Sequence, residues 1–387
     1  WLEQTYLMGP SLHYNRDLHL LYRKLIHDMM DAQTETGLVP AIAPEFILFT
    51  YDDGNFRDSP EWGSACIRLP WLLYEWYGDS TMLRKAYPMM KKYQQHLAGK
   101  AKGHILSHGL GDWYDLGPNP PGVSQLTPKG VTATAIYYDN YKLLAKIATQ
   151  IGQVKDAKDF TARALVVKQA FNDSFYHAAQ KIYAKGSQTA MAMPLVLGLV
   201  PAGDEAEVLR NLADSLKANN YRLTAGDIGY HYLVKALQQN GLDEILFSMN
   251  SRDDVPGYGY QLKNGATALT ESWAALPTVS NNHFMLGHIM SWFYSGIGGI
   301  RQQENSKGYT NLVIAPKITG GLNFASTSFQ IPQGKVVSNW QIEEGKLMIE
   351  VLVPANTKAT LQVPSPSSRV QKTIELGSGS YQFTFDW

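Results

Sequence analysis

The chain has 387 residues, of which 44% are hydrophobic and 18% charged, a composition typical of a well-buried globular protein with one large and one smaller domain. Its 34 basic and 34 acidic residues balance to a net charge of +0, so no excess of positive charge points to a nucleic-acid partner. No apolar run reaches the roughly 18–20 residues that a membrane-spanning helix needs.

Apolar residues recur at helical spacing through the first 300 residues. The spacing predicts helices over residues 11–35, 60–77, 81–98, 127–150, 156–172, 188–198, 203–218, 227–239, 242–249 and 282–295. Ser59 with Pro60 is a favourable helix start, and Gly198 a favourable helix end. Short turns alternate with long loops rich in acids and rings, which is typical of a ring of helical hairpins with its functional loops on one face.

Beyond residue 300 the spacing changes from helical to alternating. Residues 310–387 carry apolar side chains at every second position, with turns such as Glu344-Gly345 between the runs. This pattern is typical of antiparallel strands with one buried face. We therefore expect a mainly α-helical catalytic domain over residues 1–302 and a C-terminal antiparallel β-sandwich with a structural role over residues 303–387.

Three of the long loops combine carboxylates with indoles. They hold Asp58 with Trp62, Asp112 with Trp113 and Asp115, and Glu271 with Trp273 and His283. In a helical barrel these loops would converge on one end. Carboxylates among aromatic rings suit glycoside cleavage, because one acid must protonate the leaving oxygen and one carboxylate must activate water or attack carbon. The apolar face of a sugar also stacks on an aromatic ring.

Taken singly, these residues have plainer interpretations, such as a loop-capping aspartate or a structural histidine. Other chemistries find no matching pattern, since His283 and His288 lack the spacing of a zinc-protease helix. No Gly-x-Ser-x-Gly elbow and no phosphate-binding loop is present. The single cysteine, Cys66, stands in an apolar helix start and is expected to be a buried thiol. We expect no cofactor and no metal, because two carboxylates and water suffice for glycoside cleavage.

Several short motifs follow one another in order along nearly the whole chain. They are Trp1-Leu2-Glu3-Gln4, Gly111-Asp112-Trp113, the run 127–135, the helix start Thr224–Gly229, Gly265-Ala266-Thr267 with Glu271, Asn282-His283 and the run 353–357. On these residues the chain resembles the bacterial α-L-rhamnosidases of glycoside hydrolase family 78. The resemblance implies an (α/α)6 barrel followed by a β-sandwich, and release of terminal α-L-rhamnose from a rhamnose-containing glycan with inversion.

The resemblance also implies a role for individual residues. Glu271 matches the general base that activates water. The resemblance implies that Trp1, Trp62, Asp112, Trp113 and His283 bind the substrate. Asp58, the loop aspartate beside Trp62, completes the set of expected substrate-binding residues. Asp112 among them is expected to bind sugar hydroxyls.

The chain departs from the family pattern in three places. The family's general acid lies in a segment ending in the residue that matches Trp1, so we expect the proton donor, the missing barrel helices and further domains upstream. Gln4 stands where the family usually has Asp, and Thr270 where the base is often preceded by Trp. Residues 1–387 alone are therefore expected to be a poor enzyme.

Two other interpretations stay open. One is a helical-barrel glycosidase for another deoxy-sugar or a uronic acid, which a panel of aryl glycosides would distinguish. The other is a non-catalytic carbohydrate-binding protein on a hydrolase scaffold, which would bind sugar without turnover. The sequence leaves open the glycoside, the linkage, the oligomeric state and any bound ion. It also leaves the compartment open, with a periplasmic or extracellular location slightly favoured over the cytoplasm for a bacterial glycan hydrolase.

Overall fold

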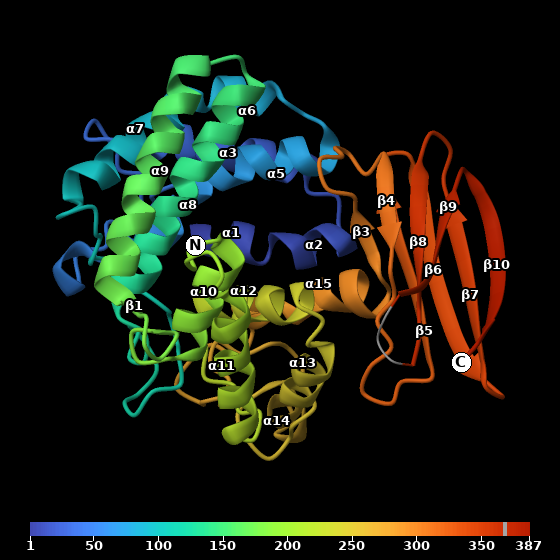
Figure 1. The fold of residues 1–387 in the computed structure, drawn as a ribbon. Coiled ribbons are helices and arrows are strands. Elements are labelled where there is room, and N and C mark those ends of the chain that lie inside the picture. The colour runs from blue at the N-terminus through green and yellow to red at the C-terminus, as the bar shows by residue number, and fades with distance from the viewer. Residues whose placement is uncertain (367–369) are drawn as a thin grey trace.

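The computed structural model describes residues 1–366 and 370–387, which form a helical part and a β-sandwich (Figure 1). The helices are α1 Leu2–Leu7, α2 Gly9–Asn15, α3 His19–Ala32, α4 Pro60–Gly63, α5 Ala65–Tyr77, α6 Thr81–Lys85, α7 Tyr87–Lys100, α8 Lys129–Gln150, α9 Val154–Phe175, α10 Gln188–Leu197, α11 Glu205–Ala218, α12 Asp227–Gln239, α13 Asp243–Asn250, α14 Tyr258–Lys263 and α15 Ile289–Trp292. The strands are β1 Tyr176–His177, β2 Ile182–Tyr183, β3 Ile300–Gln302, β4 Asn311–Ile314, β5 Phe324–Ile331, β6 Gly334–Glu343, β7 Lys346–Val353, β8 Lys358–Pro364, β9 Val370–Leu376 and β10 Gly379–Asp386. The predicted class, mainly α with a C-terminal β domain, is confirmed.

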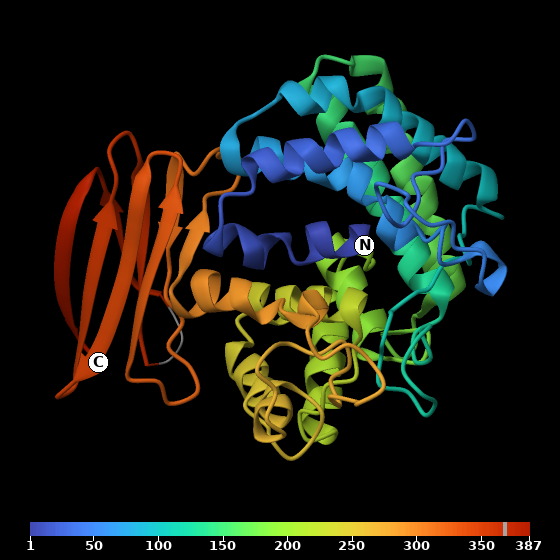
Figure 2. The same ribbon diagram turned by 180° about the vertical axis from the view of Figure 1, so that it is seen from behind.

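Helices α1 and α2 run through the middle of the helical part. In Figures 1 and 2 they lie between α3 and α5 on one side and α15 on the other. Helix α1 packs against α5 and α12, and α2 packs against α15. The long helices α8 and α9 lie side by side, and α10 packs on α8 and α12. These hairpins surround the centre as the incomplete helical barrel that was predicted.

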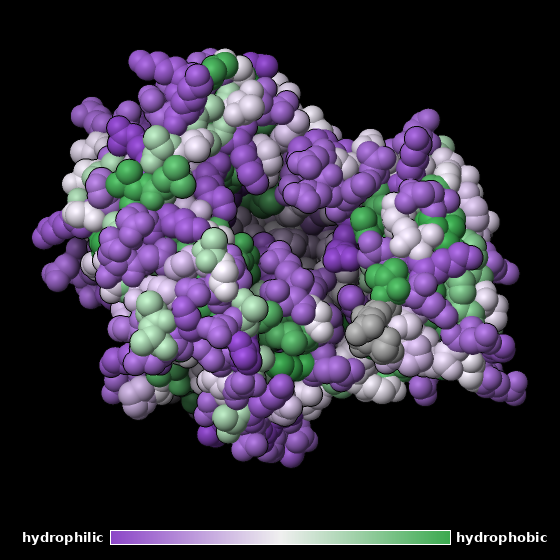
Figure 3. Space-filling model, in the orientation of Figure 1, coloured by the Kyte–Doolittle hydropathy of each residue, from purple (hydrophilic) through white to green (hydrophobic). Residues whose placement is uncertain are grey.

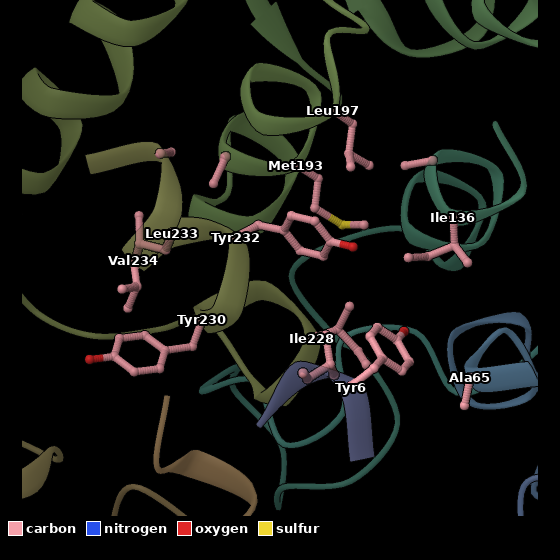
Figure 4. Close-up of a cluster of buried hydrophobic side chains, with 14 of the residues drawn as sticks. Tyr6, Ala65, Ile136, Met193, Leu197, Ile228, Tyr230, Tyr232, Leu233 and Val234 are labelled. Atoms are coloured by element: carbon pink, nitrogen blue, oxygen red, sulfur yellow. The ribbon is translucent and has the colours of Figure 1, made fainter. Parts of the chain in front are cut away.

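Side chains from separate helices meet in one core at the centre of the barrel. Figure 4 shows Tyr6 of α1 beside Ile228 of α12, with Ile136 of α8 and Met193 of α10 around them. All four are buried, and burial of each large apolar side chain contributes about 1.5–3 kcal/mol. The core therefore fixes the positions of the helix ends from which the long loops emerge.

The predicted helix over residues 282–295 is interrupted because a side chain from α2 enters its backbone. The hydroxyl of Ser11 donates to the carbonyl of His288 at 3.0 Å and accepts from the N–H of Ser291 at 3.1 Å. A polar group inserted into the helical ladder breaks the regular spacing. The resulting pieces are a 3-10 turn at Phe284–Leu286, α15 and a π turn at Phe293–Ile297.

The predicted helix over residues 11–35 is two helices, α2 and α3. Arg16 between them is extended, with φ −144° and ψ 150°. The side chain of Asp17 then accepts the N–H of His19 at 2.9 Å, a local contact that competes with helical hydrogen bonding. Breaks of one residue also divide two other predicted helices, 60–77 at Ser64 and 81–98 at Ala86. The sequence did not predict the short elements α1, α14, β1, β2 and β3.

Several predicted helix ends are confirmed. Gly78 after α5 and Gly198 after α10 are left-handed, with φ of 73° and 75°, the conformation that glycine adopts most readily at a helix end. Ser59 precedes α4 and Pro60 is the first residue of this helix, as expected. The Ser59 hydroxyl, however, donates to the Glu61 carboxylate at 3.0 Å instead of capping the helix.

The sandwich consists of two four-stranded sheets, ordered β10-β7-β6-β5 and β3-β4-β8-β9. Buried and exposed residues alternate along β5, β7 and β8 as predicted. The Glu344-Gly345 turn joins β6 to β7, with both residues at positive φ, which suits a two-residue hairpin. One strand pair departs from the antiparallel expectation. Strands β4 and β8 are parallel, because the chain crosses to the other sheet as β5–β7 before it returns.

The sandwich packs against one end of the helical part. The Trp340 indole donates to the carbonyl of Ile297 at 2.9 Å, and the Tyr14 hydroxyl donates to the carbonyl of Ile300 at 2.8 Å. Strand β3 pairs with β4 of the sandwich, although its residues come before residue 303. The expected domain boundary between residues 302 and 303 stays a prediction. Figure 3 shows a mainly hydrophilic face with scattered hydrophobic patches and a hollow near its centre.

Cys66 is buried, as predicted. Within the described ranges, none of the helices combines the length and the apolar character that crossing a membrane requires.

Candidate active site

A small cavity of about 50 Å³ lies at the start of α1. Figure 2 shows that this end of α1, marked N, is the end away from the sandwich. This volume holds one or two ordered waters. The structure brings together five of the predicted site residues here, Trp1, Trp62, Trp113, Glu271 and His283. Residues that were not predicted to bind substrate complete the lining: Glu3, Gln4, Phe56, Leu110 and Met285.

Size alone does not identify the site. A larger hollow, of about 620 Å³, lies where α5 meets the loop before β4, and Glu75 and Lys307 are among its lining residues. Those two residues form an ion pair at 4.0 Å, which leaves the carboxylate less available for chemistry. The small cavity instead combines a carboxylate, an imidazole and indoles, and so we place the site there.

Backbone hydrogen bonds hold Glu271 and His283 next to each other. The N–H of Glu271 donates to the carbonyl of Ser280 at 2.9 Å, and the N–H of His283 donates to the carbonyl of Leu269 at 2.8 Å. These two hydrogen bonds close residues 271–283 into a loop. Glu271 and His283 therefore lie side by side where the two ends of the loop meet. Oε2 of Glu271 lies 3.9 Å from Nδ1 of His283.

The first helix sets the proton position on His283. Nε2 of the Gln4 amide lies 2.9 Å from Nε2 of His283, and an amide nitrogen only donates. The imidazole Nε2 therefore accepts, and the proton of the neutral ring is on Nδ1, toward Glu271. Burial lowers the pKa of His283, and the Glu271 carboxylate opposes part of that shift. The ring is therefore neutral near pH 7.

The three indoles differ in exposure. Trp62 is buried, Trp113 is half-buried and Trp1 is 43% exposed. Trp273, grouped with Glu271 in the sequence, is fully buried outside this lining, and its indole donates to the carbonyl of Ala225 at 2.8 Å. Trp273 thus anchors the segment that carries Glu271, rather than facing the cavity.

Glu3 is a second carboxyl group in the lining that the sequence did not single out. It is almost completely buried, and its Oε2 has no hydrogen-bond partner. Burial, with repulsion from the buried Asp227, raises the pKa of Glu3 well above its ordinary value. The only sequence signal was an acid two positions after Trp1, in a helix that the spacing did not predict.

Asp58 lies outside the cavity, although the sequence grouped it with the substrate-binding residues. Its carboxylate is buried and contacts His96 at 3.0 Å, His108 at 3.4 Å and the ammonium of Lys100. Burial by itself opposes ionisation, but the close contacts with His108, His96 and Lys100 outweigh it and hold the pKa of Asp58 below its ordinary range. This carboxylate fastens the loop before α4 to the end of α7, and a role of Asp58 in substrate binding stays a prediction.

Asp112 is also absent from the lining of the cavity, and its expected contact with sugar hydroxyls stays a prediction. It is fully buried, and it accepts from the N–H of Gly229 at 2.7 Å, the N–H of Gly226 at 3.0 Å and the hydroxyl of Thr189 at 2.5 Å. These partners occupy both oxygens at the start of α12, where a helix favours negative charge. Burial and the neighbouring Asp115 nevertheless raise the pKa of Asp112 to about 7. These hydrogen bonds connect the loop that carries Trp113 to the start of α12.

The arrangement suits activation of a water molecule. A half-buried carboxylate faces a neutral imidazole that carries its proton on the near nitrogen, and aromatic rings surround both. Such a carboxylate can accept a proton from water that attacks a bound group. In the part of the chain that the structure describes, there is no group of three or more His, Cys, Asp or Glu side chains that could hold a metal ion.

Known protein families match both parts of the chain. Residues 1–297 match the family model of the bacterial alpha-L-rhamnosidase 6 hairpin glycosidase domain, and residues 299–375 match that of the bacterial alpha-L-rhamnosidase C-terminal domain. Among curated proteins, the α-L-rhamnosidase of Alteromonas sp. strain LOR is 29% identical over 97% of this chain and 42% of its own length. That of Streptomyces avermitilis is 28% identical over 99% of this chain and 38% of its own length. The chain thus spans about two fifths of these relatives.

Solved structures agree with this match. The α-L-rhamnosidase from Dictyoglumus thermophilum superposes with a TM-score of 0.90 at 29% identity, over 100% of this chain and 46% of that protein. The Streptomyces avermitilis α-L-rhamnosidase in complex with L-rhamnose gives a TM-score of 0.89 at 26% identity, over 100% of this chain and 38% of that protein.

Proposed function

The chain belongs to the bacterial α-L-rhamnosidase family, and from this premise we propose that it forms the sugar-cleaving part of a hydrolase that releases terminal α-L-rhamnose by inversion, with Glu271 as general base. The observation that carries the proposal is the cavity in which Glu271, His283 and three indoles meet. The substrates of the proposed hydrolase are rhamnose-containing glycosides or polysaccharide side chains.

The base acts on a water held against its carboxylate. Glu271 removes a proton as the water attacks the anomeric carbon, while the Nδ1–H of His283, 3.9 Å from Oε2 of Glu271, orients the carboxylate or the sugar. Inversion leaves room for this water between the two catalytic carboxyl groups, which then lie roughly 6.5–9.5 Å apart.

We propose that the proton donor belongs to sequence upstream of Trp1, as the family resemblance implies. Within the chain, Asp58 stays ionised beside the ammonium of Lys100, and Asp112 is enclosed by its hydrogen bonds. Glu3 is the carboxyl in the cavity whose raised pKa keeps a proton available at neutral pH. It is therefore the first residue to examine if residues 1–387 alone are active.

We propose that the rings and His283 hold the sugar. Trp1, Trp62 and Trp113 offer planes for the apolar face of rhamnose, and His283 offers a hydrogen bond. Asp58 and Asp112 contribute indirectly, because Asp58 fixes the loop that leads into α4, which carries Trp62, and Asp112 fixes the loop that carries Trp113.

The test is release of nitrophenol from 4-nitrophenyl α-L-rhamnoside by the longest natural polypeptide that contains this chain. Residues 1–387 are assayed alongside. We expect the long form to be active and the short form to be slower by roughly 10²–10⁴, the contribution of one general acid. Glu271→Gln in the long form should abolish turnover and retain rhamnose binding. Glu304→Gln, an exposed position beyond the helical part, is the matched control.

Other outcomes would favour the competing interpretations. Retention of most activity in Glu271→Gln would refute the assignment of the base. Cleavage of a different glycoside in an aryl-glycoside panel would indicate another sugar, and rhamnose binding without turnover would indicate a carbohydrate-binding protein.

A further inference from the structure

The solvent-facing side of one sheet of the sandwich carries a hollow of about 430 Å³, which we call the sheet groove. It lies over strands β5, β6, β7 and β10. Figure 1 places β10 at the side of the sandwich away from the helices, whereas β5 contacts α2. The cavity that contains Glu271 lies at the end of α1 away from the sandwich, and the two sets of lining residues share no member. The sheet groove is therefore separate from the candidate active site.

Strand register arranges the side chains of the sheet groove in two rows. Residues directly opposite one another on neighbouring strands point to the same face of a sheet. The first row consists of Ser326, Asn339, Glu350 and Gln382, and the second of Phe324, Gln341, Met348 and Thr384. Asn339 is half-buried and the others are exposed. Because the four strands lie about 4.8 Å apart, each row is about 14 Å long, which is enough for a chain of sugars.

The polar groups of the sheet groove match the chemistry of hydroxyl groups. Amide and hydroxyl side chains both donate and accept hydrogen bonds, as sugar hydroxyls do. The Ser326 hydroxyl donates to Oδ1 of Asn339 at 2.9 Å, and the Asn339 amide donates to Oε2 of Glu350 at 2.9 Å. Among the described residues, the side chains of Gln382 and Thr384 have no hydrogen-bond partner. One end of the first row is thus held in place, and the end of both rows at β10 is available to a ligand.

Charge and composition restrict the class of ligand. Glu350 is the one charged side chain among the described residues that line the groove, so no cation there would attract an anionic polymer. The ring of Phe324 is 69% exposed and Met348 is 36% exposed, but Gln341 stands between them. A protein interface has a continuous apolar core. An isolated exposed ring among amides and hydroxyls instead suits the apolar face and the hydroxyl groups of a neutral sugar.

We propose that the sheet groove binds a neutral glycan chain, with sugar hydroxyls bonded to the two rows and one sugar ring against Phe324. The choice of glycan rests on the proposed function, because it is the polysaccharide from whose ends the cavity removes rhamnose. Binding at the groove holds the polymer to the enzyme while its free ends reach the cavity. The sandwich then has a binding role in addition to the structural role expected from the sequence.

Affinity electrophoresis of the long polypeptide, in gels that contain a neutral α-L-rhamnan, tests the groove. Glu271→Gln is present throughout, so that the polymer is not degraded. We expect the rhamnan to retard the protein, and Gln382→Ala and Phe324→Ser each to weaken the affinity roughly 2- to 10-fold, the factor for losing one hydrogen bond or one apolar contact. Two controls should retain the affinity. They are Gln371→Ala, at an exposed position on β9 of the other sheet, and Leu20→Ser, at a position that is 78% exposed on α3.

Hydrolysis separates this inference from the proposed function. With Glu271 intact, Gln382→Ala should slow the release of rhamnose from dilute rhamnan by a similar factor and leave cleavage of 4-nitrophenyl α-L-rhamnoside unchanged. Retardation by rhamnan without cleavage of any rhamnoside would refute the proposed function and support the groove. Cleavage without retardation, or retardation that either variant leaves unchanged, would overturn the groove.

Two further outcomes would identify another occupant. Equal retardation by polygalacturonate, which is anionic, would overturn the assignment to a neutral glycan. A dimer in solution that Phe324→Ser dissociates would assign this face to a second copy of the chain, and would overturn the glycan site.

Discussion

Nε2 of Gln4 lies 2.9 Å from Nε2 of His283, and this contact connects the first helix to a loop 279 residues further along the chain. The amide donates, so the imidazole presents its proton to Glu271 on the other side. The side chain at position 4 therefore determines the protonation of the ring beside the proposed base.

We expect Gln4→Glu to raise the pKa of His283. A carboxylate at this position accepts a hydrogen bond instead of donating one, and together with Glu271 it stabilises the imidazolium. An opposite charge at this distance shifts a pKa by about 1–3 units, upward from a value that burial now lowers. An NMR titration of the His283 ring measures the shift.

Gln4→Met is the matched control for this titration. It removes the amide without adding charge, so the pKa of His283 should not rise. An unchanged titration in Gln4→Glu would contradict the inferred contact between the two side chains.

We expect Glu3→Gln to stabilise the protein at neutral pH. Burial raises the pKa of Glu3 in the folded state, so the unfolded chain loses this proton at lower pH than the folded protein does. Below the unfolded pKa of about 4.3 the stability contributed by Glu3 is fully present, and it is lost as pH rises through the folded pKa. Each unit of difference corresponds to about 1.4 kcal/mol.

Urea unfolding at several pH values measures this effect. The gain from Glu3→Gln should vanish below pH ~4 and grow toward neutral pH. Glu35→Gln, at an exposed position, should stay within about 0.5 kcal/mol of the parent protein. A gain of the same size at every pH would show that Glu3 does not retain its proton.

We expect Gly229→Ala to destabilise the protein by about 1–3 kcal/mol through overpacking. A Cβ at this position would lie 1.8 Å from the hydroxyl of Thr189 and 2.7 Å from Oδ2 of Asp112. The same change would loosen the hydrogen bonds that hold the loop of Trp113. Thermal unfolding measures the loss, and Gly229→Ala combined with Thr189→Ala should recover part of it.

Gly99→Ala is the matched control within a helix. A Cβ at Gly99 meets no atom within 4 Å, so this change should stabilise α7 by about 0.5–1 kcal/mol, because alanine is the better helix former. Equal effects of the two substitutions would contradict the close packing around Gly229.

Most of the fold was predictable because its signals are local. Helical spacing through residue 300 and alternation after residue 310 follow from which face of each element is buried. Glycine at the ends of α5 and α10, and Glu344-Gly345 between β6 and β7, act through backbone conformations that other residues adopt less readily. The break in the helix over residues 282–295 was not predictable, since Ser11, nearly three hundred residues away, interrupts it.

The candidate site was predictable in part. The sequence pointed to Glu271, His283, Trp62 and Trp113 because acids beside rings suit sugar chemistry, and the structure places these four around one cavity. It could not show that Glu3 also lines this cavity. The sequence also could not show that Asp58 and Asp112 lie outside the lining of the cavity. The local sequence around a loop aspartate is the same whether the side chain faces a ligand or a helix start.

The sequence by itself determined the class of fold, the order of its two parts and the family, because these depend on periodicity and on short motifs. Only the tertiary structure decided which carboxyl groups face the cavity and in which protonation state. The physical reason is that burial and hydrogen-bond partners set both properties. The partners of Asp112 and His283 come from α10, α12 and α1, so no local stretch of sequence contains them.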